Sequence, residues 1–278
     1  MDSLFRKQFD SHPLVYRSKL TIPRKVNFGL EIELDKVDYN EVYSLVRQSN
    51  VGDWIVKRDK SLTEGRNAEL VSPVLQNTKD TWIMLKEMAE MIKQIDASYN
   101  KCSFQVNLDG SLLPSDADKV RFLKLWAFYE DILYRFFKGE DSEYRDSIDR
   151  FASPIILTLK SLGSFSDRGI VDMFSNNKRY GVVFKTRDVD LIELRGPNMT
   201  DNPILWQNYV STFYYLLKCS TGYGYDKKEV DSYIDKFFKS YVLESYEVEK
   251  EEKAMQFVKK IFPHNSDRIS FMHQYLKR

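Results

Sequence analysis

The feature that most constrains the fold is the stretch NFGLEIELDK, residues 27–36, in which apolar and acidic residues alternate. A period of two is typical of a β-strand, because successive side chains point to opposite faces of the sheet. One face then carries Leu30, Ile32 and Leu34. The other carries Gly29, Glu31, Glu33 and Asp35. Three acids in a row repel one another, so we expect solvent, lysines across the sheet or a cation to compensate them.

Further segments of the chain read as strands and helices in alternation. A hairpin is predicted from residues 53–57 and 68–73, ending at Pro73, and a second from 179–185 and 189–196 around a turn at 186–188. Residues 102–109 form another strand. Helical patterns cover 77–96, 115–137 and 202–218, and a mostly helical tail from residue 226 onward is broken at Pro263.

These short connections favour an α+β fold, with an antiparallel or mixed sheet, helices packed on one face and the other face free. We expect an N-terminal extension over residues 1–24, a main domain over 25–220 and a helical C-terminal appendage over 221–278. We assign no function to the appendage.

Composition excludes several classes of protein. With 42 basic and 41 acidic residues, no net charge favours nucleic acid or an anionic membrane as partner. Cys102 and Cys219 lie far apart without a CxxC pattern, which argues against a zinc knuckle or a disulfide scaffold and fits a reducing compartment. Because no apolar run resembles a signal peptide or a membrane span, we expect a cytoplasmic protein.

Histidine is scarce, and this limits the available chemistry. The three histidines lie close to the chain ends, at His12, His264 and His273. A mechanism that needs a histidine base in the central region is therefore disfavoured, and a Ser/His/Asp triad has no obvious material. Carboxylates, arginines and amides remain.

The polar sides of the predicted strands share an unusual composition. A solvent-washed sheet face normally mixes threonine, lysine and arginine with glutamate, whereas this face is rich in carboxylates and amides. Its members are Glu31, Glu33, Glu69, Gln105, Asn107, Glu193 and Arg195. Glu31 and Glu33 have Cα atoms roughly 6 to 7 Å apart, which suits two hard cations such as magnesium.

The remaining polar residues extend this interpretation. Glu69 and Glu193 offer further oxygens, and Gln105 and Asn107 offer neutral carbonyl ligands or hydrogen bonds. Arg195 suits a phosphate, because its planar fork of donors matches phosphate oxygens; Arg179 and Lys185 are weaker candidates for that role.

A structural reading of the same residues stays open. A single acidic pair on a strand is often solvated surface, and Glu193 beside Arg195 is compatible with an ion pair worth under about 1 kcal/mol. The interpretation as a site requires that the carboxylates converge. It loses its basis if they scatter, or if a neighbouring lysine already neutralises each of them.

The order of segments resembles the amidoligase family, a group of carboxylate–amine ligases with a glutamine-synthetase-like fold. The resemblance covers about residues 25–220. It rests on FGLEIEL, a tryptophan with RDKSL leading to AELVSPVL, then CSFQVNLD, then IELRGPNMTDNPILWQNYVSTFYYLL. Each motif is short, but together in this order they are specific.

The resemblance implies an antiparallel sheet backed by helices, whose concave face binds ATP and magnesium. It implies γ-phosphoryl transfer to the carboxylate of a small amino acid or peptide, then attack of an amine on the acyl phosphate. Carried over by position, the metal ligands would be Glu31, Glu33, Glu69 and Glu193. Glu193 and Arg195 would be catalytic, with Arg195 steadying the phosphate. From the chemistry of the residues themselves, we expect the cofactor to contact Gln105, Asn107, Arg179, Lys185 and Arg195.

One departure from the family pattern opens an alternative function. Relatives tend to carry histidines where this chain has Gln105 and Asn107, and an amide cannot transfer protons at neutral pH. The alternative is a catalytically weakened module that binds a nucleotide or an amino acid on the same scaffold. The identity of the substrates and the oligomeric state stay open.

Overall fold

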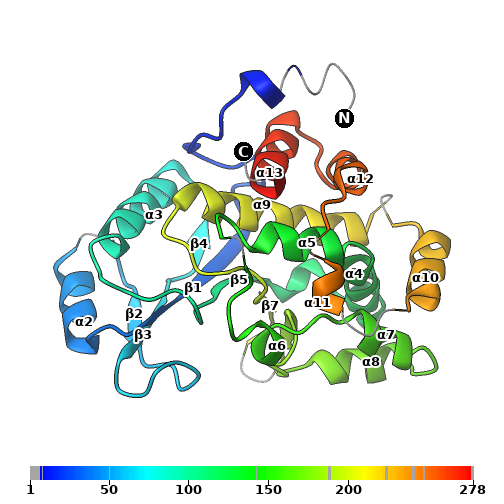
Figure 1. Cartoon of the computed structure of the whole chain (residues 1–278), viewed down its shortest axis with the longest axis horizontal. Helices are drawn as coiled ribbons and strands as arrows, with labels where there is room; N and C mark the ends of the chain where they lie inside the picture. The colour runs from blue at the N-terminus through cyan, green and yellow to red at the C-terminus, as the bar shows by residue number, and fades with distance from the viewer. Residues whose placement is uncertain are drawn as a thin grey trace.

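The computed structural model describes residues 7, 9–49, 51–141, 143–186, 189–222, 225–238, 242–246 and 248–276. It is an α+β fold built on one open antiparallel sheet of seven strands (Figure 1). The strand order is β2-β3-β1-β5-β7-β6, and β4 pairs with the start of β1. The strands are β1 (Asn27–Asp35), β2 (Ile55–Lys57), β3 (Asn67–Val71), β4 (Leu75–Gln76), β5 (Phe104–Asp109), β6 (Val182–Lys185) and β7 (Leu191–Leu194).

Both predicted hairpins and both predicted single strands are confirmed. β2 pairs with β3, and β6 pairs with β7, each antiparallel. Residues 187 and 188, in the predicted turn of the second hairpin, lie outside the described residues. β1 occupies the middle of the sheet between β3 and β5. Its acidic residues therefore have neighbours on both sides.

Helices make up most of the remaining chain. They are α2 (Tyr39–Gln48), α3 (Lys79–Ile92), α4 (Asp116–Phe128), α5 (Glu130–Phe137), α6 (Ile148–Phe151), α7 (Ile156–Ser161), α8 (Asp167–Phe174), α9 (Pro203–Ser220), α10 (Lys227–Lys236), α11 (Val242–Ser245), α12 (Glu251–Ile261) and α13 (Asn265–Leu276), with a 3-10 turn η1 (Gly110–Leu112). None of the described helices combines the length and the apolarity needed to cross a bilayer.

The helix starts follow from local chemistry. The Thr78 hydroxyl accepts the backbone N–H of Thr81 and begins α3, and Ser115 with Asp118 forms a capping box at α4. Pro203 stands in the first turn of α9, where its missing N–H costs no hydrogen bond.

The single helix expected over residues 115–137 is wrong in one respect. It is two helices, because Tyr129 leaves the helical conformation, with φ −105° and ψ 12°, between α4 and α5. After this break the fully buried carboxylate of Glu130 accepts the backbone N–H groups of Ile155 and Ile156. A tertiary contact of this kind leaves no periodic trace in the sequence.

The apolar face of the sheet packs against α3 and α9, which cross it in Figure 1. Phe28 of β1 stacks on Trp82 of α3 at 5.7 Å between ring centroids, and Phe104 of β5 stacks on Trp206 of α9 at 5.4 Å. Each fully buried side chain of this kind contributes about 1.5 to 3 kcal/mol by leaving water. The hydrophobic core is continuous from Phe9 to residues of the C-terminal helices.

The polar face of the sheet is covered, which corrects the expectation of a free face. Glu193 and Gln105 are 0% and 1% exposed. Thr63, in the loop between β2 and β3, bonds Asp35 through its backbone N–H and its hydroxyl. On the other side the carbonyl of Phe151, in α6, accepts from Arg195. Loops and a short helix, rather than a helical layer, thus close over the acidic residues.

Candidate active site on the polar face of the sheet

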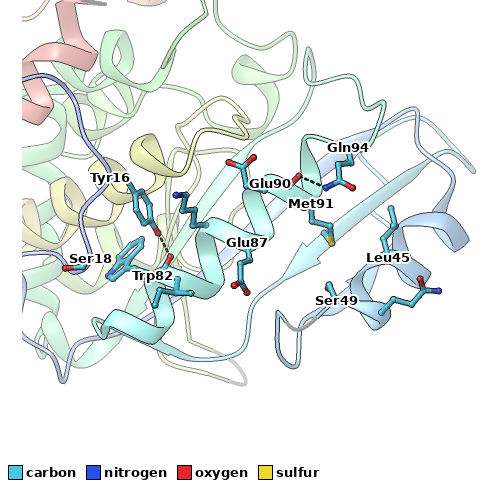
Figure 2. Close-up of a pocket in the computed structure, with 12 residues that line it drawn as sticks. Tyr16, Ser18, Leu45, Ser49, Trp82, Glu87, Glu90, Met91 and Gln94 are labelled. Carbon is cyan, nitrogen blue, oxygen red and sulfur yellow. Dashed lines mark hydrogen bonds between the residues drawn. The ribbon is translucent and has the colours of Figure 1, made fainter.

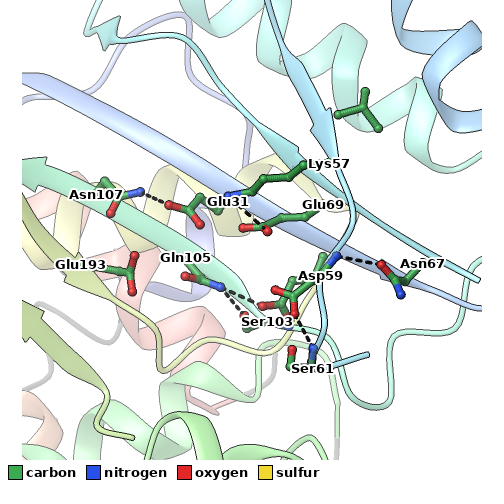
Figure 3. Close-up of polar contacts among 12 residues, drawn as sticks. Glu31, Lys57, Asp59, Ser61, Asn67, Glu69, Ser103, Gln105, Asn107 and Glu193 are labelled. Atoms are coloured by element: carbon green, nitrogen blue, oxygen red, sulfur yellow. Dashed lines mark hydrogen bonds and ion pairs between the residues drawn. The ribbon is translucent and has the colours of Figure 1, made fainter. Parts of the chain in front are cut away.

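The strand register brings the predicted polar residues together on one face. Glu33 lies opposite Glu69, Glu31 opposite Gln105, and Asn107 opposite Glu193. Figure 3 shows the side chains of Glu31, Glu69, Gln105, Asn107 and Glu193 pointing toward one another from β1, β3, β5 and β7. The first condition for a site, convergence of the carboxylates, is therefore met.

Glu31 and Glu69 form a carboxyl pair in the centre of the face. The hydrogen bond between their side chains moves the pKa values of the two carboxyl groups in opposite directions. Burial, that hydrogen bond and the charge of Glu31 raise the pKa of Glu69 to about 9. Burial alone would raise the pKa of Glu31, but the bond to Glu69 and the charge of Lys185 lower it to about 2. Lys57 of β2 reaches Glu69 at 3.3 Å.

Glu33 is held by amide groups and has no lysine partner among the described residues. Its carboxylate accepts the backbone N–H of Ser103 at 2.6 Å and the side-chain amide of Gln105 at 2.8 Å. Burial raises the pKa of Glu33, and the positive charge of Arg145 opposes that rise. Both carboxylate oxygens are thus bonded from β5 or its edge.

Glu193 and Arg195 form an ion pair on β7 and the residue after it. Arg195 Nη1 donates to Glu193 Oε1 at 2.7 Å and to Gln105 Oε1 at 2.8 Å. Its Nε donates to the carbonyl of Phe151 at 3.1 Å. Arg195 Nη2 makes no hydrogen bond within the described part of the chain, so only the N–H groups of this nitrogen are left over.

Lys185 of β6 bridges two of the carboxylates. Its Nζ lies 3.5 Å from Glu31 Oε1 and contacts Glu193 Oε2 directly. Burial would lower the pKa of Lys185, but the charges of Glu193 and Glu31 raise it above its usual value. A single cation therefore reaches Glu31 and Glu193 at once.

Asn107 carries an unsatisfied acceptor beside this bridge. Its Nδ2 donates to Glu31 Oε1 at 2.8 Å, while its Oδ1 is buried and has no hydrogen-bond partner. The residue as a whole is 7% exposed. In Figure 3 the amide oxygen is turned away from Glu31. A buried carbonyl without a donor costs about 1 to 3 kcal/mol, so it marks a place for a donor or a cation.

Arg145 holds the backbone next to the site, and the sequence analysis did not predict it. Its guanidinium donates to the carbonyls of Arg195, Gly196 and Pro197, at 2.8, 2.8 and 3.0 Å. These bonds hold the backbone directly after β7, at Arg195, in place. Arg145 lies in an irregular segment without periodicity, so no sequence signal pointed to it. Lys57, by contrast, lies opposite Glu69 in the predicted hairpin, so the alternation of side chains could have placed it on the same face.

Arg179 is not part of the cluster. It is exposed, and its described contacts are made by its backbone, with Asn177 Oδ1 and with the N–H of Ser153. The other eight predicted residues lie on the face, each in hydrogen-bond or ion-pair contact with another member.

The residues present fit one divalent cation better than two. Within the described part of the chain, no three His, Cys, Asp or Glu side chains are arranged to hold a metal ion. Glu31 and Glu193 nevertheless supply two carboxylates around the position of Lys185 Nζ. Magnesium is typically held by one or two carboxylates together with water and phosphate oxygens. Lysines already reach Glu31, Glu69 and Glu193, so a cation would compete with them.

Two cavities differ in how they relate to the cluster. One of about 310 Å³ opens at its edge and is lined by Glu31 and Asn107. A larger one of about 870 Å³ lies between α2, α3 and the N-terminal segment, with Tyr16 and Trp82 in its wall (Figure 2). No predicted site residue lines the larger cavity.

Comparison with known proteins adds no relative. No family model matches the chain, and no curated protein matches it significantly. The class that fold and site define is an α+β protein with a buried, charge-balanced cluster of carboxylates, amides and basic groups on one sheet face.

Proposed function

We propose that the chain is an ATP-dependent carboxylate–amine ligase on a glutamine-synthetase-like fold, as its resemblance to the amidoligase family implies. The observation that carries the proposal is the convergence of Glu31 and Glu193 on a position that the Lys185 ammonium group already occupies. Such a position, next to an arginine with donors to spare, suits the triphosphate of a nucleotide.

The reaction has two steps. The γ-phosphoryl group of ATP passes to a substrate carboxylate, giving ADP and an acyl phosphate. An amine then attacks the acyl carbon, phosphate leaves, and the amine nitrogen loses a proton to the medium or to a base. Phosphoryl transfer depends mainly on positioning and on neutralising charge.

The residues have separate tasks in this reaction. Arg195 Nη2 binds an oxygen of the transferring phosphoryl group, while Glu193 and Gln105 hold the guanidinium in place. Glu31 and Glu193 would hold one magnesium ion, which neutralises phosphate charge when bound. Lys185 would have to leave this position for the ion to bind, and its side chain, which is 26% exposed, has room to do so.

Magnesium-dependent ADP release tests the proposal. Glu31→Gln and Glu193→Gln should each reduce it below detection while near-ultraviolet circular dichroism stays unchanged. Glu87→Gln, on the exposed side of α3, is the matched control and should keep full turnover. Turnover that persists in both site variants would reject the assignment.

A second candidate is a module that binds nucleotide or amino acid without turnover. The lysine contacts to Glu31, Glu69 and Glu193 favour it, because a site that supplies its own cations needs no metal. Calorimetry with ATP and magnesium, followed by ADP detection with pooled carboxylates and hydroxylamine, separates the two. Hydroxylamine traps acyl phosphates without a protein base, so binding with no ADP and no hydroxamate supports the module.

A further inference from the structure

The cavity of about 310 Å³ beside the cluster has an acidic rim and an open floor. We call it the Gly29 pocket. It is lined by Gly29, Glu31, Ser72, Asn107, Asp109 and Asp190, with Val71, Pro73 and Leu191 as apolar walls. It lies where the ends of β1, β5 and β7 meet the segment after β3, directly next to the carboxylate of Glu31.

Gly29 keeps the floor of the pocket empty. It stands on the polar face opposite Asn107, and the next three residues on this face of β1 are Glu31, Glu33 and Asp35. A Cβ built on Gly29 would lie 3.6 Å from Asn107 Cβ and 3.7 Å from Ser72 Oγ, which is ordinary contact. The backbone thus tolerates a side chain here, and a larger one would fill the space.

The charge around the pocket has one sign. Glu31, Asp109 and Asp190 line it, and no lysine, arginine or histidine does so among the described residues. Asp109 accepts the backbone N–H of Ser111, and neither Asp109 nor Asp190 has a cationic partner in the described part of the chain. A Cβ on Gly110 would overlap the Asp190 carboxylate, so this glycine lets the carboxylate lie against the backbone of the residue after Asp109.

A second observation points to a ligand with hydrogen-bond donors. Asn107 lines the pocket, is 7% exposed, and its Oδ1 has no partner. Its Nδ2 is committed to Glu31 Oε1, which fixes the orientation of the amide. An ammonium group carries three donors and a positive charge, and so matches an amide oxygen flanked by carboxylates.

We propose that the Gly29 pocket binds the ammonium group of an aliphatic primary amine that has no carboxylate beside its amino group. Asp109, Asp190 and Glu31 attract the positive charge, and Asn107 Oδ1 accepts one N–H. An α-amino acid is disfavoured, because its carboxylate would face these acids without a basic partner. Ammonia alone would leave the apolar walls of Val71, Pro73 and Leu191 uncovered.

Only the role of the bound amine rests on the proposed function: in a ligase, it would be the substrate that attacks the acyl phosphate. The pocket adjoins Glu31, on the same face as the position assigned to the phosphates, so an amine held there lies beside the acyl phosphate. Binding itself needs neither nucleotide nor turnover.

Calorimetry with n-butylammonium on the full chain tests the pocket, with butyrate and norvaline as matched probes. We expect butylammonium to bind, butyrate to give no heat, and norvaline to bind at least about tenfold more weakly. Asp190→Asn should weaken butylammonium binding about three- to tenfold. Asp96→Asn, an exposed acid beyond α3, should leave it unchanged.

Filling the pocket gives the sharper test. Gly29→Val should abolish butylammonium binding, whereas Gly29→Ala should keep most of it. If Gly29→Val does not fold, a double variant of Asp109→Asn and Asp190→Asn decides by the same measurement. Equal binding of butyrate, or unchanged affinity in the folded Gly29→Val or in the double variant, overturns the proposal.

The result is separable from the ligase assignment. If the protein binds butylammonium, loses that binding when Asp109 and Asp190 are replaced, and shows no ATP turnover, the pocket is supported and the ligase assignment is rejected. Magnesium-dependent ATP turnover with no ammonium binding rejects the pocket and supports the ligase.

Discussion

Lys185→Met is the perturbation that most directly tests how the acidic face is balanced. Lys185 Nζ contacts Glu193, which is fully buried, and lies 3.5 Å from Glu31. Methionine keeps the length of the side chain and removes the charge. Removing one partner of a buried ion pair typically costs about 3 to 5 kcal/mol. Here Glu193 retains Arg195 at 2.7 Å and Lys185 is partly exposed, so we expect about 2 kcal/mol.

Magnesium should restore part of this loss. If a divalent ion binds where Lys185 Nζ lies, it no longer competes with the lysine in the variant. At a magnesium concentration about ten times its dissociation constant, binding adds about 1.4 kcal/mol to the free energy of unfolding. Urea unfolding with and without magnesium measures both terms, and the wild type should respond much less than the variant.

Lys93→Met is the control, because Lys93 pairs with Glu90 at 3.0 Å on the exposed side of α3. Its removal should cost under about 0.5 kcal/mol, with no effect of magnesium. Two outcomes would refute the reasoning. Either Lys185→Met is as stable as the wild type, or magnesium stabilises both proteins equally.

Three further predictions concern the pair of glutamates, the core and a helix start. The pKa of Glu69 is raised to about 9 in the folded state. Above about pH 5 the folded state therefore holds a proton that the unfolded state has lost. The free energy of unfolding should fall between about pH 5 and 9, by up to about 1.4 kcal/mol per pH unit. Urea midpoints across that range should show the slope in the wild type and lack it in Glu69→Gln. Phe104→Ala should cost about 3 to 5 kcal/mol in urea unfolding, since the ring is fully buried against Trp206 and Tyr209. Asp38→Ala should cost about 1 kcal/mol in the same assay, because the Asp38 side chain accepts two backbone N–H groups at the start of α2.

Much of the sheet and its polar face was readable from the sequence, because alternation is a local signal. Leu30, Ile32 and Leu34 are all 0% exposed, and their acidic neighbours meet on the opposite face. The same parity rule aligned β3, β5 and β7. Residues within one strand, or opposite each other in a hairpin, obey a rule that a single chain can reveal.

The cover over the polar face was not readable, because it depends on contacts between distant segments. Arg145 reaches the end of β7 across 50 positions in the chain, through hydrogen bonds to backbone carbonyls of any residue type. Thr63 reaches Asp35 from a loop. Such contacts bury the acids without any pattern of their own, which is why a free face was predicted.

The two amides where the family resemblance leads one to expect histidines preserve one property of imidazole and lose another. Gln105 donates to Glu33 and accepts from Arg195, so it links two charged groups, as a neutral imidazole with one donor and one acceptor also can. Asn107 donates to Glu31 and keeps its oxygen unsatisfied. Neither amide moves a proton at neutral pH. In a ligase, phosphoryl transfer would tolerate this change, because it relies on positioning and charge. The attack of the amine would not, because its nitrogen must lose a proton. Any weakening of the chemistry should therefore fall on the second step, where hydroxamate formation would outpace amide formation.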